Sequence, residues 1–307
     1  MKILKRISIV CMVLSFLLTD IFCGVGTTSG QFLKIGPSAR ALGMASSFGA
    51  VSDDVYAIHF NPAGLSQIKK EEVSATYLKY FADVNYGFLG YVKPSQSGAM
   101  GFGITYLIVD GMEKRDESEN FIGNFNAKDM SMVVSYTRKN VMEKSLPGMN
   151  IGGTVRTIIS EIDQTTAYSA SVDIGAFYSP LEKLNIAVVL QNISWGIKYK
   201  EEADILPLNL KLAGAYKITN ILTVASDIDM YLIDAISYAS VGVEYSIGKY
   251  LILRGGYRYG YDTQHLGSLV GVAVGMGVRM WNVGVDYAFV PFGDLGDTHR
   301  VSLSFRF

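Results

Sequence analysis

The strongest constraint on the fold is a two-residue alternation of side chains that recurs from about residue 70 to the end of the chain. In the run that opens at Gly267, the even-numbered residues from Val270 to Met280 are apolar, and the odd-numbered residues between them are mostly glycine or alanine. The last ten residues alternate in the same way and end at Phe307. Successive residues of a strand face opposite sides of a sheet, so each such run predicts a strand with one apolar face and one small or polar face.

Fourteen segments show this pattern, and after the first 23 residues there is neither a sustained helical period nor an apolar run of about 18 residues. The predicted strands are 73–81, 85–94, 97–109, 129–138, 149–161, 167–178, 184–192, 206–218, 221–231, 237–247, 249–261, 268–280, 281–290 and 298–307. Transmembrane barrels have an even number of strands, each of about 9–11 residues. The longest gaps, at 110–128 and 193–205, are charged and are predicted to be loops.

A secreted β-sandwich would also alternate, but its outward face would be rich in charged and polar residues. Here the second face is rich in glycine, alanine and serine, and charged residues make up only 18% of the chain, against about 25% in soluble domains. The formal net charge of −1 offers no basic surface for nucleic acid. The prediction is therefore an all-β fold: a 14-stranded antiparallel transmembrane β-barrel with a small, partly helical N-terminal hatch.

The first 23 residues have the order of a signal peptide. Lys2, Lys5 and Arg6 precede an apolar run over residues 7–18, which is too short to span a membrane comfortably. A lipoprotein signal is disfavoured, because Ile21 and Phe22 before Cys23 are not small. We expect export, with a signal peptide at 1–23, a hatch at 24–70 and a barrel at 71–307.

The hatch segment shows local helix signals. Ser52 or Asp53 is placed to cap a short helix over residues 55–60, and Asp53 and Asp54 would suit its positive end. Asn61 followed by Pro62 is typical of an N-cap and first helical residue. A compact, partly helical piece ahead of the strands predicts a plug in the barrel lumen.

The sequence IGPSARALGMASSFGAVSDDVYAIHFNPAGL, residues 35–65, resembles the N-terminal signature of the PorV/PorQ family, outer-membrane barrels of the FadL-like superfamily. The segments at 190–192 and 206–218 and the terminal Phe307 fit the same resemblance. It implies a 14-stranded barrel with a hatch that contains Asn61, Pro62 and Ala63. It also implies that Phe305 and Phe307 form a signal for the barrel-assembly machinery.

The resemblance implies two alternative functions. PorV-like members act in type IX secretion and bind exported proteins, whereas FadL-like members pass long-chain fatty acids or other hydrophobic compounds. We expect a secretion component in the cell outer membrane, with uptake of hydrophobic small molecules as the alternative and a purely structural barrel as the third. The expected partners are outer-membrane lipids, exported proteins or secretion machinery, and the assembly machinery.

Two groups of candidate site residues follow. Hatch or gating residues are Asp53, Asp54, Asn61, Pro62, Ala63 and Gly64, for which plain capping is the alternative role. Asp53, Asp54 and His59 share no helix face, so they are not predicted to bind a metal. No cofactor is expected, and no catalytic motif occurs in a supporting context, which predicts a non-enzymatic protein.

The second group consists of charged residues on the predicted lumen face. Such charges need partners in a low-dielectric interior. They serve either as a static salt-bridge network that holds the hatch or as a polar conduit, with Arg254, Arg258 and Arg279 attracting anions. The residues are Arg156, Asp173, Lys211, Asp227, Asp229, Glu244, Arg254, Arg258, Arg279 and Asp286, with Arg300 and Arg306 on the same face.

Overall fold

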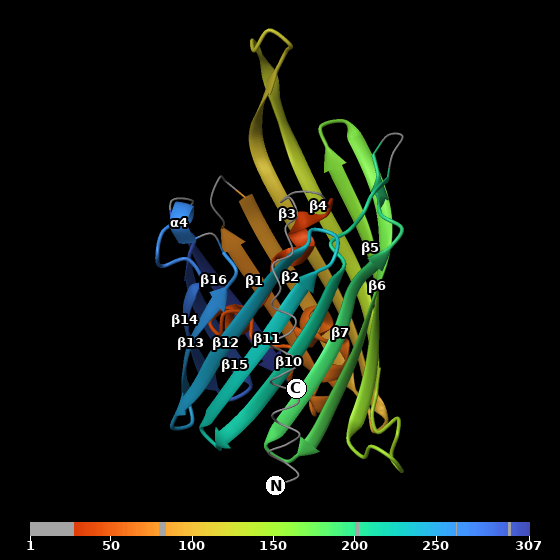
Figure 1. Cartoon of the computed structure of the whole chain (residues 1–307), viewed down its shortest axis with the longest axis vertical. Coiled ribbons are helices and arrows are strands. Elements are labelled where there is room, and N and C mark those ends of the chain that lie inside the picture. The colour runs from red at the N-terminus through yellow and green to blue at the C-terminus, as the bar shows by residue number, and fades with distance from the viewer. Residues whose placement is uncertain (1–27, 80–83, 200–202, 262, 294–295) are drawn as a thin grey trace.

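The computed structural model describes residues 28–79, 84–199, 203–261, 263–293 and 296–307. Fourteen antiparallel strands form a closed barrel in which sequence neighbours are also spatial neighbours (Figure 1). Its strands are β1 (Glu72–Lys79), β2 (Val84–Pro94), β3 (Gly98–Arg115), β4 (Phe121–Arg138), β5 (Met149–Ile162), β6 (Thr165–Leu181), β7 (Leu184–Ser194), β10 (Asn209–Thr219), β11 (Leu222–Tyr231), β12 (Ile236–Ile247), β13 (Leu251–Tyr259), β14 (Val272–Met280), β15 (Val283–Pro291) and β16 (Asp297–Arg306).

The barrel closes between its first and last strands. β1 pairs with β16 from Glu72 opposite Arg306 to Lys79 opposite His299, without a register shift. The predicted 14-stranded antiparallel barrel is confirmed. The predicted signal peptide, residues 1–23, lies outside the described residues.

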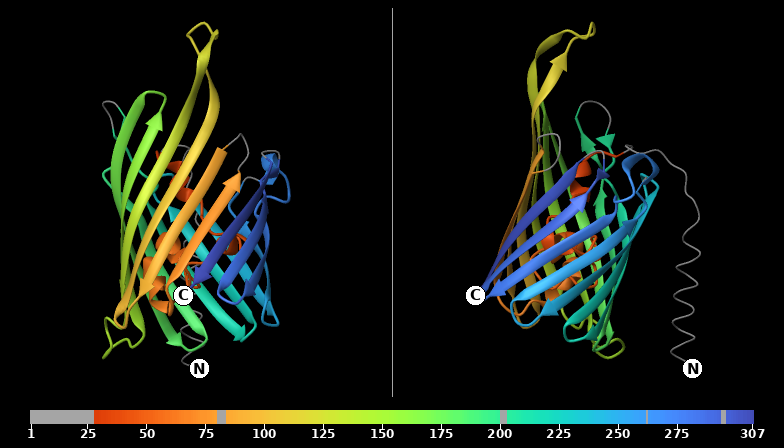
Figure 2. Two further views of the ribbon diagram at one scale, coloured as in Figure 1. Left: turned by 180° about the vertical axis from the view of Figure 1, so that it is seen from behind. Right: turned by 90° about the vertical axis from the view of Figure 1, so that its left-hand side faces the viewer.

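The two ends of the barrel differ. We call the end that carries the short connections 95–97, 182–183, 220–221, 248–250 and 281–282 the turn end, and the opposite end the loop end. β16 finishes at the turn end, whereas the β3–β4 hairpin rises well above the loop end (Figure 2).

Several predicted strand boundaries were wrong. Residues 110–128 are not a loop, because β3 continues to Arg115 and β4 starts at Phe121. The pairing of the two strands with each other supplies the backbone partners that a charged composition does not reveal. β14 starts at Val272 instead of 268, since Gly267 and Gly271 have φ of 99° and 95°, which ends an extended chain.

Another wrong boundary is the start of β10, predicted at 206 and found at Asn209. Pro207 has no N–H to donate to a ladder. The predicted loop at 193–205 contains a two-stranded sheet of β8 (Ile197–Lys198) and β9 (Ala203–Asp204).

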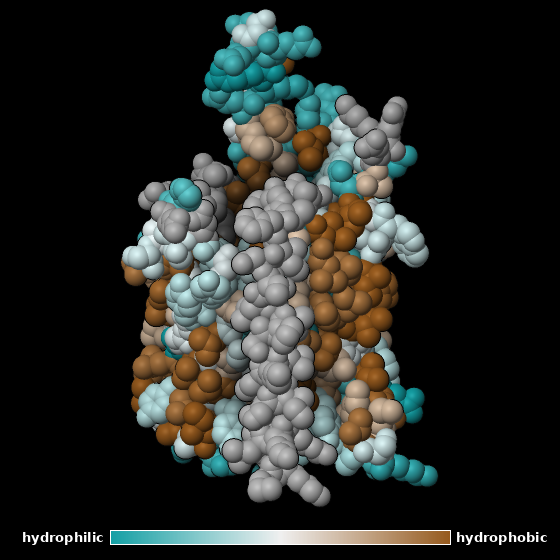
Figure 3. All heavy atoms as spheres, in the orientation of Figure 1, coloured by the Kyte–Doolittle hydropathy of each residue, from teal (hydrophilic) through white to brown (hydrophobic). Residues whose placement is uncertain are grey.

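The outer wall of the barrel is apolar. Large side chains that alternate with buried ones remain exposed there, among them Tyr136, Val188, Val241 and Leu303. Figure 3 shows apolar residues over the barrel wall and hydrophilic residues over the hairpin above the loop end. The exposed Trp195 and Trp281 lie near opposite ends, as expected of aromatic girdles at the two membrane surfaces. None of the described helices is long and apolar enough to cross a membrane.

The lumen is filled by the N-terminal segment. We call residues 28–70 the plug segment; it runs from the loop end to the turn end, where β1 begins (Figures 1 and 2). Its short helices are η1 (Gln31–Lys34), α2 (Ala39–Leu42), α3 (Ala57–Phe60) and η2 (Pro62–Gln67). One further helix, α4 (Thr263–Leu266), lies between β13 and β14.

Candidate functional site

The plug segment has an apolar core of its own. Met44, Phe48 and Leu65 are fully buried, and the rings of Phe48 and Phe60 meet edge to face with centroids 5.3 Å apart. These side chains pack within one cluster that also contains inward residues of the barrel, including Phe88 and Val133. The lumen is thus occupied by packed protein.

The Asn61–Pro62 element lies against the barrel wall. As expected, Asn61 caps η2: its Oδ1 accepts a hydrogen bond from Ala63 N at 3.0 Å, and Pro62 opens the helix. Asn61 Nδ2 donates to Gly49 O at 2.9 Å. A Cβ on Gly175 would lie 2.3 Å from Asn61 Oδ1, and one on Gly152 would lie 2.4 Å from the carbonyl carbon of Pro62. Glycines on β5 and β6 therefore make the space that this element fills.

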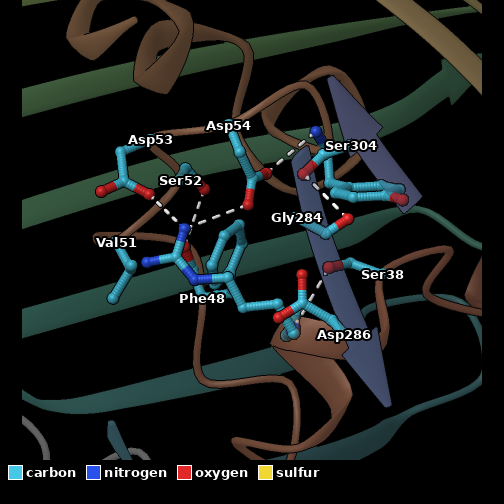
Figure 4. Close-up of polar contacts among 12 residues, drawn as sticks. Ser38, Phe48, Val51, Ser52, Asp53, Asp54, Gly284, Asp286 and Ser304 are labelled. Atoms are coloured by element: carbon cyan, nitrogen blue, oxygen red, sulfur yellow. Dashed lines mark hydrogen bonds and ion pairs between the residues drawn. The ribbon is translucent and has the colours of Figure 1, made fainter. Parts of the chain in front are cut away.

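Asp53 and Asp54 do not cap α3, which corrects the expectation from sequence. α3 begins at Ala57, and its N-cap residue Tyr56 makes no side-chain cap bond. Asp54 instead accepts a hydrogen bond from Tyr56 N at 3.0 Å, and both carboxylates bind Arg40, as Figure 4 shows for Asp53 and Asp54. Burial raises the pKa of Asp54 to about 7, and the neighbouring Arg40 opposes this rise.

Arg40 connects the plug segment to the wall, a role that no local sequence pattern indicates. Its Nη1 lies 2.5 Å from Asp53 Oδ1 and 3.1 Å from Asp54 Oδ2. Its Nε and Nη2 bind the two carboxylate oxygens of Glu244 on β12, at 2.9 and 3.0 Å. This two-point pairing of a guanidinium with a carboxylate is geometrically specific.

The chain of charges continues along the wall from Glu244. Arg254 Nε donates to Glu244 at 2.7 Å, and its Nη1 donates to Asp286 at 2.8 Å. Arg279 binds the same Asp286 at 2.7 Å. The network thus extends across β12, β13, β14 and β15.

A second cluster lies on β10, β11 and β13. Lys211 Nζ lies between Asp227, at 3.4 Å, and Asp229, at 2.5 Å. Asp229 also pairs with Arg258 at 3.2 Å. Asp227 accepts hydrogen bonds from the backbone N–H groups of Phe48 and Gly49, so this cluster also holds the plug segment.

The third group of lumen charges is the ion pair of Arg156 and Asp173, with 3.1 Å between Nη2 and Oδ2. Asp173 also accepts from Asn192 N at 2.7 Å, where the β6–β7 pairing shifts register and Asn192 has a φ of 61°. Each of the ten predicted lumen charges therefore has an ionic partner in the described part of the chain.

At the loop end, the start of the plug segment is held by contacts that sequence reasoning missed. Asp234, after β11, accepts from Thr28 Oγ1 at 2.8 Å and from Lys34 Nζ at 2.7 Å. Ser29 N donates to Ile205 O in the segment that contains β8 and β9, where Leu206 is fully buried. The partners lie about 170–210 residues apart, and no local pattern marks them as a pair.

Cavities lie around the plug segment, and the lining of each includes charged residues. At the turn end, three of about 200, 360 and 240 Å³ share Asp53 and include Gln67, Glu244, Arg279 and Arg306 among their linings. Nearer the loop end, a cavity of about 30 Å³ is lined by His59 and Lys211, among others. Burial, with Arg156 and Lys211 nearby, lowers the pKa of His59 to about 3, so the ring is neutral. The described residues contain no group of three or more possible metal ligands from His, Cys, Asp and Glu.

Comparison with known protein families identifies the family to which this barrel belongs. The model of a family described as "Type IX secretion system protein PorV" matches residues 23–236. The chain belongs to the PorV family. The expected family is thereby confirmed, and the protein is a transmembrane β-barrel of an outer-membrane family.

The fold of this PorV-family chain is shared by several solved structures. The CymD monoaromatic hydrocarbon channel matches with a TM-score of 0.64 and 13% identity, over 89% of this chain and 96% of that one. The P. putida toluene transporter TodX matches with 0.62 and 12%, over 92% and 99%. A Pseudomonas aeruginosa FadL homologue matches with 0.58 and 12%, over 87% and 98%. A search of curated protein sequences finds no match.

Proposed function

We propose that this barrel is a type IX-like secretion component that binds exported proteins at the outer membrane and hands them on, without catalysing a reaction. The family match over residues 23–236 carries the proposal. Its expected partners are exported proteins or other parts of the secretion machinery, together with the lipids around the apolar wall.

The packing of the lumen supports a binding role over a conducting one. A route for hydrophobic compounds needs a mostly apolar passage, whereas the turn-end cavity of about 200 Å³ beside the plug segment is lined by residues such as Arg40, Asp53, Lys217 and Glu244. Conduction through the side of the barrel would need a gap in the wall. Between β1, β2 and β3 the described wall is continuous, and β2 pairs with β3 without a shift from Val84–Val109 to Pro94–Ala99.

Uptake of hydrophobic compounds is the second candidate. The observation in its favour is the likeness to channels named for monoaromatic hydrocarbons and toluene. At 12–13% identity that likeness concerns the fold, and folds host many functions. In this alternative, the residues Asp53, Asp54 and Asn61–Gly64 would have to move to open a path.

The orientation follows from the connections. Outer-membrane barrels have short periplasmic turns and longer outer loops, so we assign the turn end to the periplasm and the loop end to the cell surface. Phe305 and Phe307 then end the last strand at the periplasmic side, exposed and with ring centroids 4.9 Å apart. We propose that they serve as the assembly signal, and that residues 1–23 are the export signal.

The test is purification of the protein from native outer membranes in mild detergent, with mass spectrometry of everything that co-purifies. Recovery of exported surface proteins that share a C-terminal domain, or of a large translocon, supports the secretion role. Near-stoichiometric fatty acids or other lipids without protein partners would reverse the order of the two candidates. Deletion of the gene must also abolish surface delivery of those proteins, and the wild-type gene must restore it.

A further inference from the structure

The β3–β4 hairpin is the one part of the described barrel wall that continues far beyond its neighbours. Above the pair Val109–Ala127, both strands continue to Arg115 and Phe121 and rise clear of the loop end (Figures 1 and 2). The turn at its tip is ordered by Asp116, whose Oδ1 accepts from Ser118 N and Asn120 N at 2.9 Å. The hairpin is thus a formed structural element.

The two strands lack outer partners above the barrel. β2 meets β3 no higher than Val109, and β5 meets β4 no higher than Ala127. Among the described residues, 112–115 and 121–125 therefore pair only with each other, with register shifts between Val109 and Met112 and between Lys114 and Arg115. Two-stranded ribbons are marginal alone, and an unpaired strand edge is a template for a further strand.

The two edges differ in access. Lys114 pairs with Asp163, in the β5–β6 connection, and Asp163 N donates to Asn126 O, so this connection lies along the β4 side. The β3 edge, residues 110–115, has no such contact within the described chain. An incoming strand would therefore add to β3.

The hairpin also has an apolar face. In β4 the odd-numbered residues Ser131, Val133 and Ser135 are buried toward the plug segment. The same alternation places Phe125 on the axis-facing side, with Asn124 on the outer side. Phe125 pairs with Met112 across the hairpin. An apolar pair of side chains thus faces the axis above the loop end.

The charge of the hairpin specifies the partner further. Residues 110–128 contain five acidic and three basic side chains, a net charge of −2. Two of the cations are already paired, Lys114 with Asp163 and Arg115 with Glu113. Asp116, Glu117 and Glu119 at the tip have no ion pair in the described part of the chain. The complementary segment is net basic.

We propose that the β3 edge of this hairpin binds an extended, net-basic segment of an exported protein by strand addition, with apolar side chains of that segment against the paired Met112 and Phe125. Main-chain hydrogen bonds supply affinity in this mode, and alternate side chains supply selectivity. The inference rests on the proposed function and names the surface through which that function is performed.

The first experiment compares three variants in the co-purification described above. One replaces residues 110–126 by an Asn-Gly turn between the paired Val109 and Ala127, which leaves the ladder below intact. The second is Phe125→Ser and the third is Asn124→Ser, a matched change of the neighbouring residue on the opposite face. Heat-modifiable mobility on gels verifies that each variant is a folded barrel.

We expect recovery of the exported protein to fall at least tenfold with the shortened hairpin and with Phe125→Ser, and to stay within about twofold of wild type with Asn124→Ser. Equal recovery with the shortened hairpin would overturn this inference and leave the proposed function standing. If wild type recovers no exported protein, the proposed function fails, and this inference fails with it.

The second experiment distinguishes strand addition from side-chain contact alone. Amide hydrogen exchange is measured on wild type with and without the exported protein that co-purifies with it. We expect new protection at residues 110–115. Protection confined to other loops, or capture of a second copy of this chain by the hairpin, would overturn the inference.

Discussion

Arg40→Met is the perturbation that most directly tests how the plug segment is held. Arg40 is 8% exposed and is the one cation that pairs with Asp53 and Asp54 in the described chain, while also binding Glu244. Methionine keeps apolar volume against Phe48, whose ring centroid lies 5.3 Å from the guanidinium carbon. The change therefore removes the charge and most of its hydrogen bonds while retaining much of the packing.

The expected cost follows from what remains unpaired. Glu244 keeps Arg254, but Asp54, which is 4% exposed, loses its ion pair. Removing one partner of a buried pair costs about 3–5 kcal/mol while the other group stays charged, so exchange is measured well above pH 7, the approximate pKa of Asp54. If the plug segment opens locally, amide exchange at residues 44–56 should accelerate roughly 100- to 3,000-fold, since 1.4 kcal/mol is tenfold.

The assay is amide hydrogen exchange of the purified barrel in detergent, read by mass spectrometry. Lys217→Met is the matched control, because Lys217 lines the same turn-end cavity, is exposed and has no ion pair in the described chain; it should change exchange less than about threefold. Barrel amides in β11 and β12 should be unaffected by either change. Unchanged exchange at 44–56 in Arg40→Met would refute the conclusion that this network holds the plug segment.

Three further outcomes are expected. Gly152→Ala should lower the yield of heat-modifiable barrel, because its Cβ would lie 2.4 Å from the Pro62 carbonyl carbon, whereas Gly153→Ala, 3.6 Å from Asp173 O, should be tolerated. His59 is neutral in the fold with a pKa of about 3, so an opened plug segment gains a proton below its ordinary value of about 6.5, and stability falls as pH drops. Lowering the pH from 7 to 4.5 should increase opening of the plug segment more in wild type than in His59→Gln. The factor of increase in wild type should be up to about 100 times the factor in the variant. Deletion of Phe307 should reduce insertion into the outer membrane, measured as the membrane-inserted fraction after synthesis, while removal of the exposed Leu146 side chain by Leu146→Ala should not.

Each of these three predictions would be contradicted by a specific result. Equal yields of the two glycine variants would mean that the wall has room for the Asn61–Pro62 element to shift. A pH response that is the same in His59→Gln would assign the titration to a group other than His59. Asp54 would not produce it, because its raised pKa makes stability rise as pH falls. Normal insertion without Phe307 would remove the assembly-signal proposal.

Sequence alone predicted the features that depend on neighbours in the chain. The alternation around Val272–Met280 and Val301–Phe307 specified strands with one lipid-facing side, because side-chain direction along a strand is local. Asn61 followed by Pro62 specified the start of η2 for the same reason, since a cap acts within three residues. The lumen position of charges such as Asp227 and Arg254 also followed from alternation.

Tertiary structure decided which partners these groups have. Arg40 reaches Glu244 across 204 residues, and Thr28 reaches Asp234 across 206, so no local pattern pairs them. The charged stretch 110–128 reads as a loop locally and becomes a hairpin because its two strands satisfy each other's backbone groups. Alternation determined that the chain forms a barrel. Closure of that barrel around the plug segment determined that its lumen is filled and its charges are paired, because a buried charge is stable only beside a partner that the fold brings to it.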